Sequence, residues 1–226
     1  MKRKIESKDK LYPTLAKELE IVLYPHPKLK KVSDKVTQFG SGLKELCQNM
    51  LKTMYHAPGI GLAAPQIGIN ERIFVCDVNY DREIIGGKKK AKRKSDSSSN
   101  DENEIDDEDI QDELPLDKQV MKLFDLDPLI FINPVIMERE GHTTYEEGCL
   151  SIPGIFDKIE RSKNLVVRYQ DIKGKYHEMQ MDDLLAICFQ HELDHLDGIL
   201  FIERLTADKF AMQKNKYLEM IKNTGK

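Results

Sequence analysis

The chain has 226 residues, of which 40% are hydrophobic and 33% charged, and its formal net charge is −4. This length and composition fit one globular domain with a substantial core. No run of about 18 apolar residues occurs, so we expect no transmembrane helix. Residues 1–20 lack the apolar segment of a secretory signal. The cysteines are scattered without a CxxC pair, which is typical of free thiols in a reducing compartment.

One segment differs from the rest in composition. Residues 88–118 carry seven basic and eleven acidic side chains, whereas the remainder of the chain carries 28 of each. The charge-balanced remainder gives no reason to expect nucleic-acid or membrane binding. Few side chains between residues 83 and 118 could enter a core, so we expect a disordered insertion within a single domain spanning 1–226. An interaction segment that docks a partner through the basic block 88–94 is the alternative.

The first half of the chain predicts one helix and two strands. Apolar residues recur at helical spacing from Ser41, which we expect to cap the helix, to about His56. A strand rich in Ile, Phe and Val is predicted over 72–78. Another is predicted over 129–137, where the Asn-Pro pair at 133–134 suggests an edge position or a bend.

The second half predicts a hairpin and two helices. Strands over 164–170 and 175–181 flank a turn signal. A helix capped by Asp182 should run to about Leu196, and its apolar residues cover most of its circumference, as in a buried central helix. A peripheral amphipathic helix is expected over 206–221. Without a βαβ alternation, the fold class is α+β, with mostly antiparallel sheets packed around the central helix and a helix at the C-terminus.

The central helix carries the strongest chemical signal, the His-Glu-x-x-His stretch from His191 to His195. Two imidazoles four residues apart share one helix face and can bind one divalent metal, while Glu192 can reach a water molecule beside it. Polar side chains on so apolar a helix are costly unless something pairs with them, and a metal would do so. The stretch therefore indicates a metal-dependent hydrolase.

A third ligand is needed, and the sequence offers more than one candidate. Phe201 occupies the position where one peptidase class has a third His, and it cannot coordinate a metal. Glu219 lies 24 residues after His195, a spacing that would suit a zinc metallopeptidase. Cys149 lies upstream in a Gly- and Pro-containing stretch. A thiolate and two imidazoles make a sound three-ligand site with one open position, which favours Cys149.

A Gly- and Ala-rich stretch, residues 59–66, follows the first predicted helix. By itself it is typical of a flexible turn. Its small residues also permit an extended ligand to approach the backbone closely, and the Gln66 amide can stabilise an oxyanion.

The stretches 59–66, 147–151 and 190–196, in this order, resemble the three signature motifs of the peptide deformylases: Gly-x-Gly-Leu-Ala-Ala-x-Gln, Glu-Gly-Cys-Leu-Ser and Gln-His-Glu-x-Asp-His-Leu. Each motif alone is of low to moderate specificity, and the three together are highly specific. The resemblance extends over about 20–205, apart from the charged insertion. It implies hydrolytic removal of the N-formyl group from the initiator Met of nascent polypeptides, with release of formate.

The resemblance also implies roles for individual residues. The metal ligands would be Cys149, His191 and His195, and Glu192 would act as general base and then general acid. The Gln66 side-chain amide and the Leu150 backbone N–H would donate to the oxyanion.

Substrate would lie as an extended strand along Gly59-Ile60-Gly61. The apolar pocket for the Met side chain would be lined by Ile60, Ile187 and Cys188. Glu147 would orient the motif or a substrate amide, and Gln190 and Asp194 would support the ligands. Arg161 would contact the substrate backbone or carboxylate, or form a surface ion pair.

Fe²⁺ is the native metal implied by the resemblance, with Zn²⁺, Ni²⁺ or Co²⁺ as substitutes. The implied partners are N-formyl-methionyl nascent polypeptides at the ribosome, and the implied location is a bacterial cytoplasm or an organelle.

Two alternative functions remain: the zinc metallopeptidase that uses Glu219, and an inactive relative that only binds peptides. Joint retention of Glu192, Gln66 and Cys149 argues against the inactive relative, because a binding module needs none of them.

Overall fold

The computed structural model describes residues 16–80 and 126–223. The insertion expected at 83–118 lies outside these residues. Among the described helices, none combines the length and the apolar character that crossing a membrane requires.

A five-stranded sheet forms the framework, and its spatial order follows the chain order. All four strand pairings are antiparallel, as the sequence predicts. The strands are β1 (Gly61–Ala63), β2 (Ile73–Cys76), β3 (Leu129–Cys149), β4 (Ile152–Gln170) and β5 (Tyr176–Asp182). The hairpin predicted around residues 171–174 is confirmed, since Gln170 of β4 pairs with Tyr176 of β5.

The strands β3 and β4 are much longer than the predicted 129–137 and 164–170. Most residues between 138 and 146 are exposed, so this part of β3 lacks the apolar alternation by which strands are recognised. Hydrogen bonding to β4, rather than burial of one face, makes it a strand. The bend predicted at 133–134 is confirmed as a shift in register, with Asn133 at a φ of 50°. An edge position is wrong, because β3 lies between β2 and β4.

Three α-helices accompany the sheet: α1 (Ser41–His56), α4 (Asp183–Leu196) and α5 (Ala207–Asn223). Their positions match the predicted helices, but the predicted caps differ. Gly40, not Ser41, occupies the cap position of α1. Asp182 does precede α4, yet its side chain accepts no hydrogen bond from the helix. Tertiary packing therefore fixes the start of both helices more than side-chain capping does.

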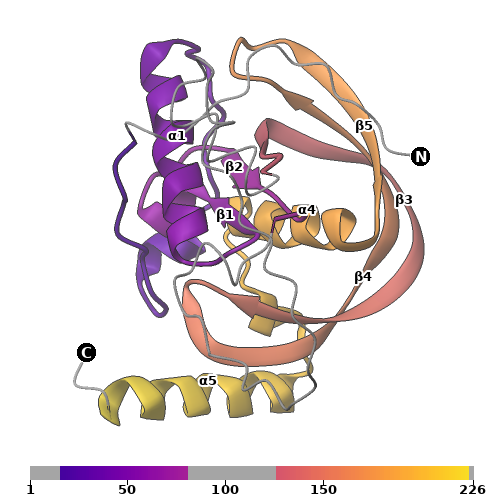
Figure 1. Cartoon of the computed structure of the whole chain (residues 1–226). Coiled ribbons are helices and arrows are strands. Elements are labelled where there is room, and N and C mark those ends of the chain that lie inside the picture. The colour runs from indigo at the N-terminus through magenta and orange to yellow at the C-terminus, as the bar shows by residue number, and fades with distance from the viewer. Residues whose placement is uncertain (1–15, 81–125, 224–226) are drawn as a thin grey trace, which may run out of the picture.

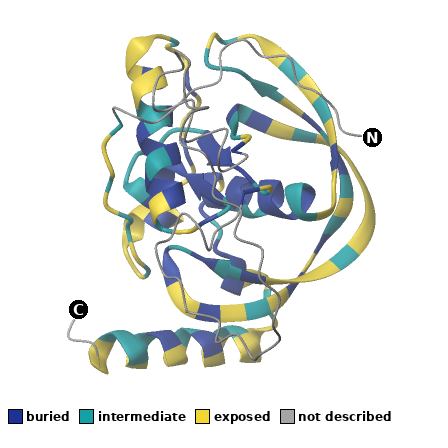
Figure 2. Ribbon diagram, in the orientation of Figure 1, coloured by how far each residue is buried: buried dark blue, intermediate teal, exposed yellow. Residues whose placement is uncertain are grey.

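The central helix α4 lies within the arch of β3, β4 and β5, while α1 covers β1 and β2 and α5 lies beneath the end of the β3–β4 hairpin (Figure 1). The residues of α4 are mostly buried (Figure 2). Phe189 of α4 anchors the helix to the sheet, because its ring meets those of Phe74 and Phe131 edge to face at centroid distances of 5.1 Å. This packing fixes the rotation of α4, and with it the direction in which the histidines point.

Candidate metal centre

Three side chains from two elements converge to form a possible metal site. Cys149 ends β3, while His191 and His195 lie one turn apart on α4. Their ligand atoms all lie within 4.8 Å of one another, and the Cys149 Sγ is 3.2 Å from the His195 Nε2. Ligands about 2.3 and 2.1 Å from a tetrahedral metal would be about 3.6 Å apart, so the spacing and the donor set fit a divalent ion.

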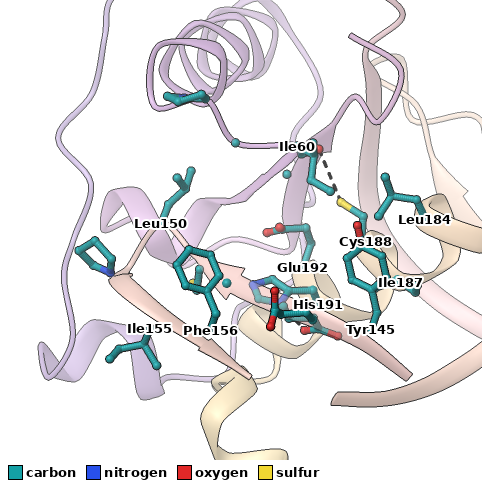
Figure 3. Close-up of a pocket in the computed structure, with 18 of the residues that line it drawn as sticks. Ile60, Tyr145, Leu150, Ile155, Phe156, Leu184, Ile187, Cys188, His191 and Glu192 are labelled. Carbon is teal, nitrogen blue, oxygen red and sulfur yellow. Dashed lines mark hydrogen bonds and ion pairs between the residues drawn. The ribbon is translucent and has the colours of Figure 1, made fainter. Parts of the chain in front are cut away.

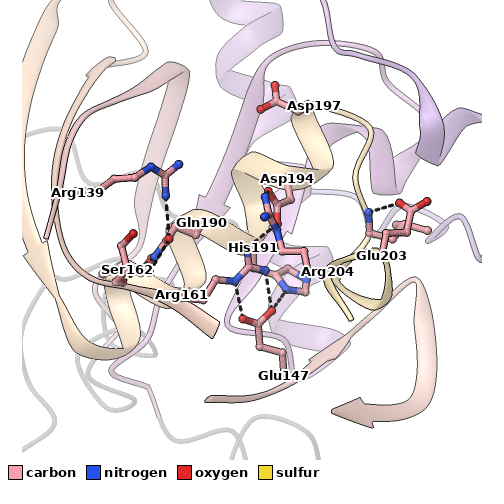
Figure 4. Close-up of polar contacts among 12 residues, drawn as sticks. Arg139, Glu147, Arg161, Ser162, Gln190, His191, Asp194, Asp197, Glu203 and Arg204 are labelled. Atoms are coloured by element: carbon pink, nitrogen blue, oxygen red, sulfur yellow. Dashed lines mark hydrogen bonds and ion pairs between the residues drawn. The ribbon is translucent and has the colours of Figure 1, made fainter. Parts of the chain in front are cut away.

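The orientation of His191 is set by Glu147, which lies two residues before Cys149. The Glu147 Oε2 is 2.8 Å from the His191 Nδ1, so the Nε2 faces the other ligands (Figure 4). A carboxylate on the second ring nitrogen fixes the ring and makes a metal-binding imidazole more basic. For His195, the Nδ1 has no partner among the described residues.

Glu147 is held in turn by Arg161, which projects from the neighbouring strand β4. The Arg161 guanidinium donates to both carboxylate oxygens of Glu147, at 2.7 and 2.9 Å, and to the Asp194 Oδ2 at 2.5 Å. Burial alone would raise the pKa of the Glu147 carboxyl, but the hydrogen bonds and charges of Arg161 and His191 outweigh it and lower the pKa to about 2. The carboxylate therefore stays ionised beside the ligand.

This ion-pair cluster corrects one expectation. Arg161 is only 4% exposed, so the predicted surface ion pair is wrong. Its guanidinium donates to two buried carboxylates, and Arg204 also donates to that of Asp194. Gln190 links the same helix to β4 by bonding both the N–H and the carbonyl of Ser162. These contacts join α4 to β4, which carries none of the three converging side chains.

Glu192 lies beside the ligands and has no such partner. It is 3% exposed, and its Oε2 is buried without a hydrogen bond to any described residue. Burial raises the pKa of the Glu192 carboxyl to about 7. A carboxyl that titrates near neutral pH can both accept and return a proton.

Gln66 completes the polar side chains around the thiol. It lies on the short 3-10 helix η2 (Ala64–Ile67), and its Oε1 accepts a hydrogen bond from the Ala63 N–H. That bond turns the Nε2 toward Cys149, whose Sγ is 3.5 Å away, and toward the Ser151 Oγ at 3.3 Å. Gln66 thus presents an N–H donor to the centre.

A cavity of about 500 Å³ opens onto these residues. Figure 3 shows His191 and Glu192 in its middle, with apolar side chains on both sides. One group comes from α4 and β3: Tyr145, Leu184, Ile187 and Cys188. The other comes from the turn after β3 and the start of β4: Leu150, Pro153, Ile155 and Phe156.

Most of the residues predicted to bind substrate line this cavity, namely Gly59, Ile60, Gly61, Glu147, Ile187 and Cys188. Arg161 is not among the lining residues. The sequence reasoning missed Tyr145, Leu184 and Phe156. The only signal for Leu184 was its position two turns before His191, and the two aromatic residues could be placed only with the full length of the hairpin known.

Glu219, the alternative third ligand, is exposed on α5. Within the part of the chain that the structure describes, Cys149 with the two histidines is the only group of three metal-binding side chains. The zinc metallopeptidase that would use Glu219 is therefore not favoured.

Comparison with known sequences identifies the family of this chain. The sequence profile of the polypeptide deformylase family matches residues 18–211. Peptide deformylase from Neisseria meningitidis is 37% identical over 206 residues, covering 91% of this chain and 98% of that protein. The enzyme from Erythrobacter litoralis is 40% identical over 204 residues, with coverages of 89% and 96%.

Solved structures of peptide deformylases share this fold. A peptide deformylase from Legionella pneumophila superposes with a TM-score of 0.68 at 30% identity, covering 92% of this chain and 98% of that one. The enzyme from Thermotoga maritima gives a TM-score of 0.62 at 35% identity, with coverages of 84% and 98%. With its three motifs gathered at one cavity, the chain belongs to the peptide deformylase family of metal-dependent hydrolases.

Proposed function

We propose that this protein removes the N-formyl group from the initiator Met of nascent polypeptides and releases formate. The observation that carries the proposal is the position of Glu192. A buried carboxylate oxygen without a partner lies beside three convergent metal-binding side chains, at a cavity bordered by an edge strand. Family membership supplies the substrate class.

Cys149, His191 and His195 would hold the metal. When bound, a divalent ion polarises the formyl carbonyl and lowers the pKa of water. We propose Fe²⁺ as the native ion, with Zn²⁺, Ni²⁺ or Co²⁺ able to replace it, because a thiolate with two imidazoles suits all of these ions.

Glu192 would take a proton from the attacking water and later give it to the leaving amine. Its burial supports this role, since it keeps both protonation states accessible near neutral pH. The neighbouring Gly61 lets the backbone of β1 pack against this carboxyl, because a Cβ at that position would lie 2.3 Å from the Glu192 Oε1.

The Gln66 side-chain amide and the Leu150 backbone N–H would donate to the oxyanion that forms at the formyl carbon. The hydrogen bond from the Ala63 N–H supports the role of Gln66, because it leaves the amide nitrogen facing the centre. A donor fixed before the reaction need not reorganise when the charge develops, and loss of one such donor typically raises the barrier by about 3 to 4 kcal/mol.

Substrate would add as a further strand along Gly59-Ile60-Gly61. Among the described strands, β1 pairs only with β2 and forms one edge of the sheet. Backbone hydrogen bonds to such an edge recognise any sequence, as processing of many nascent chains requires. The Met side chain would enter the apolar group formed by Ile60, Ile187 and Cys188.

Glu147 and Arg161 would act on the ligands rather than on the substrate, because the Glu147 carboxylate already binds both His191 and Arg161.

We further propose that the enzyme meets its substrates at the ribosome, in a bacterial cytoplasm or in an organelle. Formylated initiator Met is found on newly made chains, which supports this location.

The test is formate release from formyl-Met-Ala-Ser by the anaerobic protein reconstituted with Fe²⁺. We expect turnover that a chelator abolishes and that returns with added Fe²⁺. Acetyl-Met-Ala-Ser is the matched control, and it should not be cleaved. Absence of formate release by a protein with full metal occupancy would contradict the proposal, and so would equal cleavage of both peptides.

A further inference from the structure

A buried polar cluster lies behind the edge along which substrate is proposed to bind. Its members are Tyr55 of α1 and Asp77 and Tyr80, which follow β2; each is at most 6% exposed. The two tyrosine rings meet edge to face with centroids 4.9 Å apart, and the Tyr55 hydroxyl donates to the Asp77 Oδ2 at 2.8 Å. None of the three lines the cavity, and the chemistry proposed above uses none of them.

This cluster holds two consecutive backbone carbonyls of the edge. The Tyr80 hydroxyl donates to the Gly59 carbonyl at 2.5 Å, and the Asp77 N–H donates to the Ile60 carbonyl at 2.9 Å. On the other side of Gly59, its N–H donates to the Met54 carbonyl at the end of α1. The edge is therefore fixed from behind by groups that substrate does not touch.

The cluster itself is fixed by the Asp77 carboxylate. Besides Tyr55, it accepts the Asn79 N–H at 3.1 Å and the Asp127 N–H at 2.8 Å. Asn79 precedes residues 81–125 and Asp127 follows them, so one carboxylate joins the two described chain segments on either side of that stretch. The segment that carries Tyr80 is thereby held in place next to the edge.

The position of this edge matters because it touches the catalytic carboxylate. A Cβ on Gly61 would lie 2.3 Å from the Glu192 Oε1 and 2.8 Å from the Cys188 Sγ, so the backbone there packs closely against both. Gly61 and this carboxyl therefore fix one end of the edge, and a displacement of Gly59 and Ile60 would weaken their pairing with a peptide backbone.

We propose that Tyr80 is a positioning residue, which holds the Gly59 carbonyl so that the edge strand is ready to pair with the peptide backbone. The inference rests on the proposed function for its substrate. In the Tyr80→Phe variant the buried carbonyl loses that donor, and the edge becomes less ordered before substrate binds. The loss should weaken binding of peptides that extend along the edge, with less effect on the chemical step.

The first experiment compares Tyr80→Phe with the wild type at equal Fe²⁺ content. For formyl-Met-Ala-Ser, KM should rise about three- to tenfold, with kcat changed less than twofold. For formyl-Met amide, which has no residues to extend along the edge, the rise should be less than twofold. Tyr169→Phe is the matched control, because Tyr169 lies on β4 outside the cavity lining, and it should match the wild type.

The second experiment separates this inference from the proposed function. In a Glu192→Gln background, where turnover is strongly slowed, the Kd of formyl-Met-Ala-Ser is measured with and without Tyr80→Phe. A three- to tenfold weaker Kd supports the positioning role even if the wild type releases no formate, in which case only the proposed function fails. An unchanged Kd, an equal KM increase for both substrates, or a loss confined to kcat would overturn the role of Tyr80.

Discussion

The two walls of the cavity are built in different ways. One wall, called here the α4 wall, consists of α4 with the adjoining end of β3 and carries charged and metal-binding side chains. Behind it, Glu147 of β3, Arg161 of β4 and Asp194 of α4 form a buried ion-pair cluster. The β1 wall offers mainly backbone, held by hydrogen bonds from Tyr80 and Asp77. Metal binding and proton transfer depend on particular side chains, whereas recognition of many peptides can rely on main-chain partners. The α4 wall should therefore tolerate substitution far less than the opposite wall and its rim.

The largest effect is expected from Cys149→Ala. Loss of the thiolate leaves two imidazoles, so bound metal should fall to background and formate release should be lost. Elemental analysis of the purified, Fe²⁺-reconstituted protein measures the metal directly. Glu219→Ala is the control, since Glu219 is exposed on α5, and its metal content should equal that of the wild type. Metal loss in Glu219→Ala instead would restore the zinc metallopeptidase alternative.

Glu192→Gln should separate chemistry from metal binding on the same wall. The amide keeps the shape of the side chain but cannot accept the proton, so kcat should fall by about 10² to 10⁴. Metal content should stay at the wild-type level, because Glu192 is not one of the three converging ligands. Steady-state kinetics with elemental analysis on the same sample makes the measurement. A parallel loss of metal would show that Glu192 supports the ligands instead.

Arg161→Met tests whether the ion-pair cluster is what makes the α4 wall rigid. The change leaves Glu147 and Asp194 buried without this cation, which should cost about 3 to 5 kcal/mol of the free energy of unfolding. Metal affinity should fall about 10- to 100-fold as His191 loses its orientation. Arg168→Met, at an exposed position of the same strand, should change stability by less than about 0.5 kcal/mol. Equal unfolding curves for the two variants would refute the contrast.

The smallest effect is expected at the rim of the cavity, where Phe156 lies. Phe156 is 60% exposed at the mouth of the cavity, so Phe156→Ala should change the free energy of unfolding by less than about 0.5 kcal/mol. KM for formyl-Met-Ala-Ser should rise about two- to fivefold, because the ring offers partial apolar cover to the peptide. Tyr176→Ala, equally exposed on β5, is the control and should leave KM unchanged. A large loss of kcat in Phe156→Ala would show that Phe156, like the residues of the α4 wall, affects the chemical step.

Much of the fold could be predicted from local pattern. The three helices and the hairpin at 171–174 appeared because apolar periodicity and turn residues are local signals. The long β3–β4 hairpin did not, because its middle is exposed and its strands are defined by each other. The role of Arg161 was missed for the same reason, since Arg161 meets Glu147 only across that hairpin.

The sequence by itself was enough to select Cys149, His191 and His195 as candidate metal ligands and Glu192 as candidate base, because the spacing of His191 and His195 sets their face of the helix and the three motifs are specific in combination. Only the tertiary structure decided what surrounds them: which carboxylate orients His191, that Arg161 is buried, and that Tyr80 supports the Gly59 carbonyl. The physical reason is the sequence separation over which each kind of interaction acts. Helical spacing acts over a few residues, whereas ion pairs and hydrogen bonds between elements depend on chain segments brought together by burial of the core.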